Sequence, residues 1–267
     1  MPQGISYILR YLVINSDFTK RFTKINWCSI LIKAITLDLW DTIIQSEQGP
    51  IEPYVIMELE SIIKTIGRAI KVDMDELIKA YNSLAEYRGV FNPRVYAKLI
   101  IALLGLDINA NIVEEALIAY ENGGSQYKPR LIDGARELLQ YAKGMGLKVA
   151  VITNTHFSSG TIYKILMNSG IGEYIDLIVS SADYEVLKPH PRIFQIALQQ
   201  LNINPHEAIH IGDSCIRDVL GAYVAGLKPV LYARRQKSVD KCIRIPGLKV
   251  VYSLREAINV VEGLLHA

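Results

Sequence analysis

The sequence is poor in cysteine, in long apolar runs and in net charge. Only three cysteines, Cys28, Cys215 and Cys242, occur among its 267 residues. No two of them have the spacing of a zinc-ligand pair or a CxxC motif, and an odd count makes a poor disulfide framework. No apolar run approaches the ~18 residues of a membrane span. These shortages argue against a metal-finger module, a disulfide scaffold and an integral membrane protein.

The charge balance excludes a further class of partner. There are 29 basic and 27 acidic side chains, so the formal charge is only +2 and gives no broad electrostatic footprint for nucleic acid. Half of the residues are hydrophobic, enough for a substantial core. The length indicates one large or two unequal domains. We therefore expect a cytoplasmic protein of enzyme size with neither a nucleic-acid nor a membrane partner. Its oligomeric state cannot be predicted from the sequence.

The first 30 residues differ from the rest in charge. They hold four basic residues against Asp17 alone, a local charge of +3, whereas the other 237 residues sum to −1. Their apolar patch, Ile8–Ile14, contains Arg10, and no small-residue cleavage site follows it. A targeting arm and a membrane-surface helix are two interpretations. Because targeting features are missing, we favour an appended extension, which a start site chosen upstream would also produce.

Elsewhere, short apolar strands alternate with helices. The expected strands are Lys33–Asp38, Leu147–Thr153, Ile175–Ser180, Ala208–Gly212, Pro229–Tyr232 and Val250–Val251. The expected helices between and after them are Asp133–Lys143, Ser158–Asn168, Pro191–Leu201, Cys215–Ala225 and Leu254–Leu265. Buried strands that alternate with helices predict a doubly wound, Rossmann-like α/β fold with a parallel sheet.

Residues 51–120 break this alternation, because apolar residues recur there at helical spacing and no strand pattern interrupts them. Asp73 is expected to cap one helix and Pro93 to begin another. The segment Asn122–Ser125, with two glycines, is expected to be a flexible return. We predict a small all-helical cap domain at 46–125, inserted into an α/β core made of 31–45 and 126–267.

Polar residues gather directly after the predicted strands. In parallel sheets of this class, ligands bind beyond the carboxyl ends of the strands, so these residues should share one site. They are Asp38–Thr42, Thr153–Thr155, Lys188–Pro191, Gly212–Ser214 and Asp218. Carboxylates suit Mg²⁺, while a lysine and a threonine hydroxyl suit the oxygens of an anion. This combination indicates phosphoryl transfer.

The order and spacing of these motifs resemble the haloacid dehalogenase (HAD) superfamily of hydrolases. The resemblance covers about residue 31 to the C-terminus. It is carried most strongly by KPHPRIF at Lys188–Phe194 and HIGDSCIRDVLGAYVAG at His210–Gly226. The resemblance implies that Asp38 is the nucleophile and forms an aspartyl phosphate. It also implies that Thr153, Asn154 and Lys188 bind the phosphoryl oxygens, with Thr153 and Lys188 counted among the catalytic residues.

The same resemblance implies a magnesium site. Its ligands would be Asp38, Asp213 and the main-chain carbonyl of Trp40, with Asp218 close by. The substrate would be a small phosphorylated metabolite.

One position departs from the superfamily pattern Asp-x-Asp-x-Thr. Its second Asp, the general acid and base, is replaced by Trp40, whose indole N–H cannot supply a proton at accessible pH. Losing such a group typically costs ~10²–10⁴ in rate. Asp41 and His156 are the candidate substitutes. A structural role in the turn for Asp41, and an ordinary helix-entry position for His156, are the alternatives.

Three functions remain open. The first is a magnesium-dependent phosphatase. The second is a metal-independent 2-haloacid dehalogenase-like hydrolase, since such enzymes carry a tyrosine where Trp40 stands and halide leaves without a proton. Asp213 argues against it, because those enzymes lack the acidic metal position. The third is a non-catalytic protein that binds phosphorylated metabolites. The retained Asp38, Thr153 and Lys188 argue against this third function, and we favour the phosphatase of the three.

A chain that begins at Leu31 is expected to keep its fold and its activity, because the positive excess of residues 1–30 lies outside the superfamily resemblance. Circular dichroism and a hydrolysis assay on both chain lengths would check this. Aggregation or lost turnover of the shorter chain would contradict it.

Overall fold

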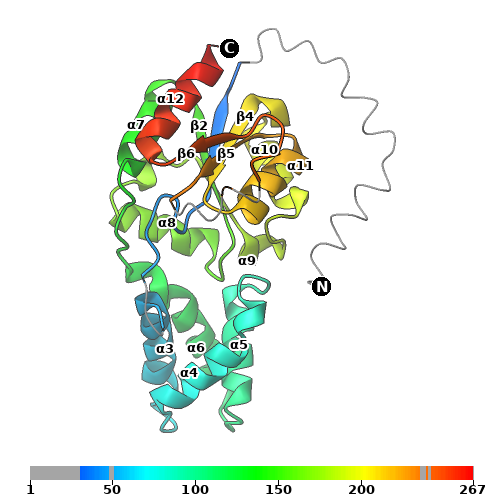
Figure 1. The fold of residues 1–267 in the computed structure, drawn as a ribbon. Coiled ribbons are helices and arrows are strands. Elements are labelled where there is room, and N and C mark those ends of the chain that lie inside the picture. Colours follow the sequence, from blue (N-terminus) through cyan, green and yellow to red (C-terminus); the bar gives the residue numbers. More distant parts are fainter. Residues whose placement is uncertain (1–30, 48–50, 235–238, 240–241, 267) are drawn as a thin grey trace, which may run out of the picture. The chain divides into compact units, whose positions relative to one another are not determined.

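A parallel sheet lies at the centre of the fold. The computed structural model describes residues 31–47, 51–234, 239 and 242–266. Within them the strand order is β3-β2-β1-β4-β5-β6, and every neighbouring pair is parallel (Figure 1). The strands are β1 Ala34–Leu37, β2 Lys148–Thr153, β3 Leu177–Ser180, β4 Ala208–Gly212, β5 Lys228–Tyr232 and β6 Lys249–Val251. This confirms the predicted doubly wound, Rossmann-like class.

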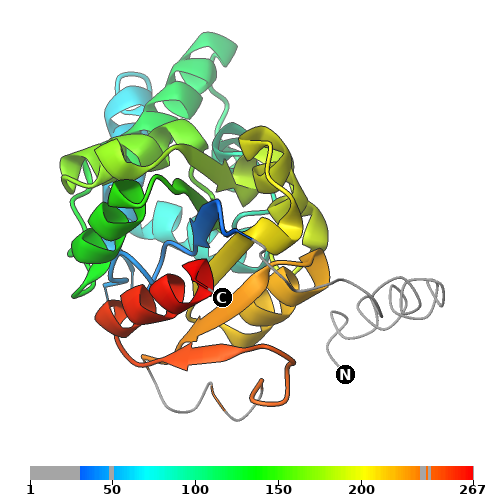
Figure 2. The same ribbon diagram turned by 90° about the horizontal axis from the view of Figure 1, so that it is seen from above.

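Helices cover both faces of the sheet (Figure 2). Successive residues of a strand point to opposite faces, so Val149 and Val151 belong to one core cluster and Ile152 to another. The first cluster includes side chains from α7 Ala135–Gly144, α8 Ser159–Asn168 and α12 Leu254–Leu265. The second includes side chains from α10 Pro191–Leu201 and α11 Gly221–Ala225. The remaining short helical segments are Gly172–Tyr174, α9 Ser181–Tyr184, Pro205–Glu207 and Cys215–Leu220.

Between β1 and β2, every regular element of the described chain is a helix. This helical insertion, residues 51–126, consists of α3 Pro53–Ile66, α4 Met74–Ser83, α5 Pro93–Leu103, α6 Ala110–Gly123 and the short turns Ala85–Tyr87 and Gly124–Gln126. It has a separate apolar cluster that includes Leu59, Tyr96 and Ile100. Asp73 caps α4 by accepting the Asp75 N–H, and Pro93 begins α5. The division into 31–45, 46–125 and 126–267 stays a prediction, and residues 1–30 lie outside the described residues.

The two glycines after Asn122 are sites of close packing, not a flexible return. A Cβ on Gly123 would lie 2.8 Å from the Cα of Glu58 in α3, and a Cβ on Gly124 would overlap the Phe157 ring. Gly123 ends α6 and Gly124 begins the next short turn. The missing side chains therefore let α6 cross α3 and let the chain pass Phe157.

Two local features around Cys215 were not predicted from the sequence. The expected helix Cys215–Ala225 begins as a π-helix over Cys215–Leu220, because both Asp218 and Val219 donate their N–H to the Ser214 carbonyl. Cys215 also forms a disulfide with Cys242, whose Cα lies 5.7 Å away. Sequence spacing carries no information on such a pairing, since the two cysteines are 27 residues apart, with β5 between them.

Among the described residues, no helix combines the length and the hydropathy that crossing a membrane requires.

We predict opposite effects of alanine at two helical glycines. Gly123→Ala should lower the free energy of unfolding by about 1–3 kcal/mol, because the new methyl group meets the α3 backbone. Gly263→Ala in the exposed part of α12, where a Cβ meets nothing within 4 Å, should raise it by about 0.5–1 kcal/mol. Urea denaturation of both variants checks this. Equal stability of the two would disprove the packing role of Gly123.

Candidate active site

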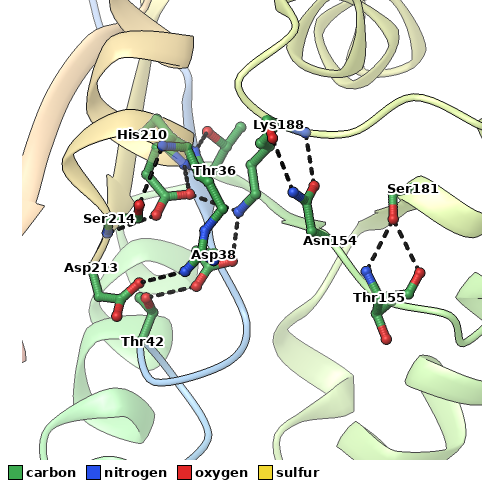
Figure 3. A network of polar contacts seen from close by, with 12 residues as sticks. Thr36, Asp38, Thr42, Asn154, Thr155, Ser181, Lys188, His210, Asp213 and Ser214 are labelled. Carbon is green, nitrogen blue, oxygen red and sulfur yellow. Dashed lines mark hydrogen bonds and ion pairs between the residues drawn. The ribbon is translucent and has the colours of Figure 1, made fainter. Parts of the chain in front are cut away.

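The ends of β1, β2 and β4 bring the predicted site residues together. Asp38 follows β1, Thr153 ends β2 and Asp213 follows β4, and these strands are direct neighbours. The backbone N–H of Asp38 donates to the Ile211 carbonyl over 2.9 Å, which continues the pairing of β1 with β4 one residue past its end. The side chains of Asp38, Asp213 and Lys188 point toward one another (Figure 3). This is the strand-end site that the sequence predicts.

A buried lysine connects two carboxylates in this site. The Lys188 Nζ donates to Asp38 Oδ1 over 2.5 Å and to Asp218 Oδ1 over 2.7 Å. Only 1% of its side chain is exposed. Burial alone would lower the pKa of Lys188, but Asp218 and Asp38 raise it above its ordinary value. Lys188 is therefore a fixed positive charge, and it holds Asp38 in one orientation.

Both carboxylate oxygens of Asp218 have polar contacts. Its Oδ2 accepts the Ser214 N–H over 2.9 Å, and its Oδ1 lies 3.3 Å from His210 Nε2. Burial opposes its charge, but Lys188 and His210 hold the pKa of Asp218 below its ordinary value. A Cβ on Gly212 would lie 2.7 Å from Asp218 Oδ2, so the Gly-Asp pair after β4 leaves room for this carboxylate.

His210 supports Asp218 from within β4. Its other nitrogen, Nδ1, lies 2.8 Å from the Thr36 hydroxyl of β1. Burial lowers the pKa of His210, which favours the neutral ring. Sequence analysis assigned no role to this pair, although both residues stand at corresponding positions of β1 and β4.

Asp213 is the third carboxylate of the site, and one of its oxygens accepts no hydrogen bond. Atoms of Asp38, Asp213 and Asp218 lie within 4.8 Å of one another. Asp213 Oδ1 is buried without a hydrogen bond, and its ion-pair partner Arg217 is 3.9 Å away. Burial, then the charges of Asp38 and Asp218, raise the pKa of Asp213 to about 7.

This group fits a divalent cation. Among the described side chains, the three carboxylates have two cationic partners, Lys188 and the more distant Arg217, so negative charge is in excess, and Asp213 Oδ1 accepts no hydrogen bond. Mg²⁺ takes oxygen ligands and is usually held by one or two carboxylates with further ligands from substrate and water.

Two threonines have different surroundings. The Thr42 hydroxyl donates to Asp38 Oδ2 over 3.0 Å, so the turn after β1 orients the second oxygen of that carboxylate. The Thr153 hydroxyl is buried and has no hydrogen-bond partner. An unpartnered buried hydroxyl is costly, and a bound anion would satisfy it. Sequence analysis had assigned Thr153 this role and had not assigned one to Thr42.

Asn154 is oriented toward the backbone of Lys188. Its Nδ2 donates to the Lys188 carbonyl over 3.0 Å, and its Oδ1 accepts the Lys188 N–H over 2.8 Å. The side chain predicted to hold phosphoryl oxygens thus uses both ends of its amide to position the lysine.

The residue in place of the general acid packs in an aromatic cluster. The Trp40 ring lies 5.3 Å from that of Tyr54 in α3 and 6.4 Å from that of Phe157. The next residue, Asp41, has a left-handed backbone (φ 60°). Its Oδ1 binds Arg234 and the Ser46 N–H, each over 3.2 Å. These contacts fit the structural role in the turn, and the choice between the two roles of Asp41 stays a prediction.

His156 is directed into the helical insertion. Its Nε2 lies 2.9 Å and 3.1 Å from the two carboxylate oxygens of Glu58 in α3. Both side chains are almost fully buried, and tyrosine rings surround the imidazole, including Tyr54 at 5.8 Å and Tyr96 at 6.1 Å. Burial raises the pKa of Glu58, against the opposing effect of His156.

Sequence analysis missed Glu58. It lies three residues after Val55 and four before Ile62, both buried, and so occupies the apolar face of α3. A carboxylate on such a face must have a buried partner, and that partner is His156.

A second contact joins the insertion to the core near the site. Gly89, with φ 77°, approaches the Thr155 carbonyl so closely that a Cβ would lie 3.1 Å from it. Ser181 fixes Thr155 by donating to its carbonyl and accepting its N–H, each over 3.0 Å (Figure 3). The loop between α4 and α5 therefore approaches the core at Thr155, the residue that follows Asn154.

The Glu58–His156 pair should be important for stability. Glu58→Leu should lower the free energy of unfolding by about 2–4 kcal/mol, because the imidazole loses its buried partner. Glu58→Gln keeps a hydrogen bond and should cost less. Exposed Glu60 of the same helix is the control, and Glu60→Leu should change stability by about 0.5 kcal/mol or less. Calorimetry would measure all three, and similar losses from Glu58→Leu and Glu60→Leu would refute the role.

Comparison with known proteins agrees with this geometry. The glyceraldehyde 3-phosphate phosphatase of Pyrococcus furiosus is 29% identical over 75% of this chain and 80% of its own. The enzyme of that name from Methanopyrus kandleri is 28% identical over 88% of this chain and 99% of its own.

A solved structure shares the fold. The 2-haloacid dehalogenase of Pseudomonas syringae pv. Tomato DC3000 has a TM-score of 0.64 at 19% identity, covering 87% of this chain and 99% of its own. A family model described as haloacid dehalogenase-like hydrolase matches residues 32–226, most of the chain. The chain belongs to the haloacid dehalogenase-like hydrolase family.

Proposed function

We propose that the protein is a magnesium-dependent phosphatase of a small phosphorylated metabolite, acting through Asp38. The observation that carries the proposal is the buried Asp38–Lys188–Asp218 arrangement, beside which Asp213 Oδ1 and the Thr153 hydroxyl have no hydrogen-bond partner. The phosphatase names of relatives that align with most of the chain support it. Phosphorylated metabolites are made and used in the cytoplasm, which is the location we propose.

The roles of the residues follow from their contacts. Asp38 attacks phosphorus, and the bond from phosphorus to the leaving oxygen breaks. Lys188 orients Asp38 and offsets negative charge on the phosphoryl oxygens, and Thr153 donates its free hydroxyl to one of them. Asn154 acts indirectly in this proposal, because it fixes the backbone of Lys188. Water then attacks the aspartyl phosphate and restores Asp38.

The magnesium ligands in this proposal are Asp38, Asp213 and the main-chain carbonyl of Trp40. Asp218 lies close by and acts mainly by holding Lys188. A bound Mg²⁺ would neutralise charge on the nucleophile and the phosphoryl group. The helical insertion, which contacts the core next to Asn154, would select the substrate.

The dehalogenase alternative is less well supported. Trp40 favours it, because an aromatic residue at that position serves a reaction that needs no acid. Against it stands Asp213, whose unpartnered buried oxygen would serve no purpose in a metal-free reaction.

Asp38→Asn should reduce hydrolysis of p-nitrophenyl phosphate by about 10³-fold or more, because the amide cannot attack phosphorus. Wild-type turnover should need Mg²⁺ and stop with a chelator. Exposed Asp133, which pairs only with Arg255, is the matched control, and Asp133→Asn should leave turnover unchanged. Release of inorganic phosphate is the measurement.

Two other outcomes would favour the dehalogenase or the binding protein over the phosphatase. Chloride released from 2-chloropropionate without metal would replace the phosphatase by a dehalogenase. Tight binding of phosphate esters with no turnover of any of them would replace it by a binding protein.

A further inference from the structure

We propose that this site takes phosphoryl donors whose leaving group departs as a stable anion: phosphoanhydrides, acyl phosphates and aryl phosphates, in preference to alkyl phosphates. The inference rests on the proposed function and concerns the substrate class of that same site. The observation behind it is that no described side chain near Asp38 is placed to protonate a leaving oxygen.

Trp40 itself cannot act as the acid. Its indole N–H is a hydrogen-bond donor without an accessible pKa. The ring is also engaged in the aromatic cluster with Tyr54 and Phe157, which belong to the insertion and to the segment after β2. The position that carries the acid in the superfamily pattern therefore holds an aromatic ring that packs against other aromatic rings.

Neighbouring acids are committed to other partners. Asp41 binds Arg234 and the Ser46 N–H through the same oxygen. His156 directs Nε2 to Glu58 within the insertion. For the Tyr54 phenol, burial raises the pKa above its ordinary value and so makes it a weaker proton donor.

The charged residues of the site are equally unsuitable. Lys188 donates to Asp38 and Asp218 at once, and loss of its proton would leave two buried carboxylates without a counter-charge. Asp213 belongs to the proposed cation site, where carboxylates act unprotonated.

The consequence for the leaving group follows from its basicity. As Asp38 forms its bond to phosphorus, the electron pair of the breaking bond stays on the leaving oxygen, and no proton accompanies it. A departing phosphate, with a second pKa of about 6, tolerates this. A carboxylate, with a pKa near 4, tolerates it better still. An alkoxide, about as basic as hydroxide, does not, and it loses the ~10²–10⁴ in rate that a general acid contributes.

The missing residue has a second effect. In the next step, water attacks the aspartyl phosphate, the electron pair of the breaking bond returns to Asp38, and the water proton passes to phosphate and solvent. No side chain assists by accepting that proton. With an activated donor this step should be the slower one, so that aspartyl phosphate accumulates and can be observed directly.

The test is a leaving-group series with the full chain and Mg²⁺. The donors are acetyl phosphate, pyrophosphate, nitrophenyl, chlorophenyl and phenyl phosphate, glycerol 3-phosphate and glyceraldehyde 3-phosphate. We expect kcat/KM to fall steeply as the leaving group becomes more basic, with both alkyl esters at least about 100-fold below nitrophenyl phosphate. Intact-mass measurement after acid quenching with acetyl phosphate should show one added phosphoryl group, absent in Asp38→Asn.

Matched variants separate proton supply from packing. Trp40→Asp should raise kcat/KM for the alkyl esters by ~10² relative to nitrophenyl phosphate. Trp40→Asn, which also removes the ring but adds no acid, should leave that ratio unchanged. Tyr54→Phe should not alter it either.

The results that overturn the inference differ from those that overturn the function. Equal kcat/KM for alkyl and aryl phosphates in the wild type would overturn the inference alone. A lower ratio of alkyl to nitrophenyl kcat/KM in Tyr54→Phe than in the wild type would also overturn it, because Tyr54 would then be the acid. If no donor released phosphate and the intact mass showed no added phosphoryl group, the proposed function and the inference would both be overturned.

Discussion

The site depends on one buried cation. Lys188 is enclosed by protein and donates to two carboxylates, one after β1 and one in the π-helix after β4. An ammonium taken out of water is stable only if its charge is balanced there, and Asp38 and Asp218 do this. The same contacts fix the orientation of both carboxylates. Burial raises the pKa of Asp38, and the charge of Lys188 opposes this effect. The remaining features, the His210–Thr36 pair, the Gly212 contact and the Asn154 amide, each fix one member of this arrangement.

Much of this could be predicted from the sequence. Strands read from short β-branched runs end within two residues of their observed limits, since buried parallel strands leave an unambiguous apolar pattern. Because their carboxyl ends meet at one edge, the convergence of Asp38, Thr153 and Asp213 followed from their positions. Lys188 lies farther from a strand, in the loop between α9 and α10.

The rest depends on partners far apart in the chain. Nothing local to Cys215 reveals Cys242, and nothing local to His156 reveals Glu58, 98 residues away. The contacts of Asn154 depend on tertiary structure for the same reason, since nothing local to it reveals that its amide pairs with the backbone of Lys188, 34 residues away. Its predicted contact with phosphoryl oxygens stays a prediction. Glu58 could have been found, because a carboxylate on an apolar helix face requires explanation.

The amide of Asn154 also makes the Lys188 loop part of the sheet. By donating to a carbonyl and accepting an N–H of one residue, the side chain reproduces the two-point pairing of a strand partner just beyond the end of β2. An aspartate could accept but not donate there, and a leucine could do neither. The backbone of Lys188 is thus held in place by the end of β2, although Lys188 itself lies in a loop. Its position should then persist for as long as β2 is folded.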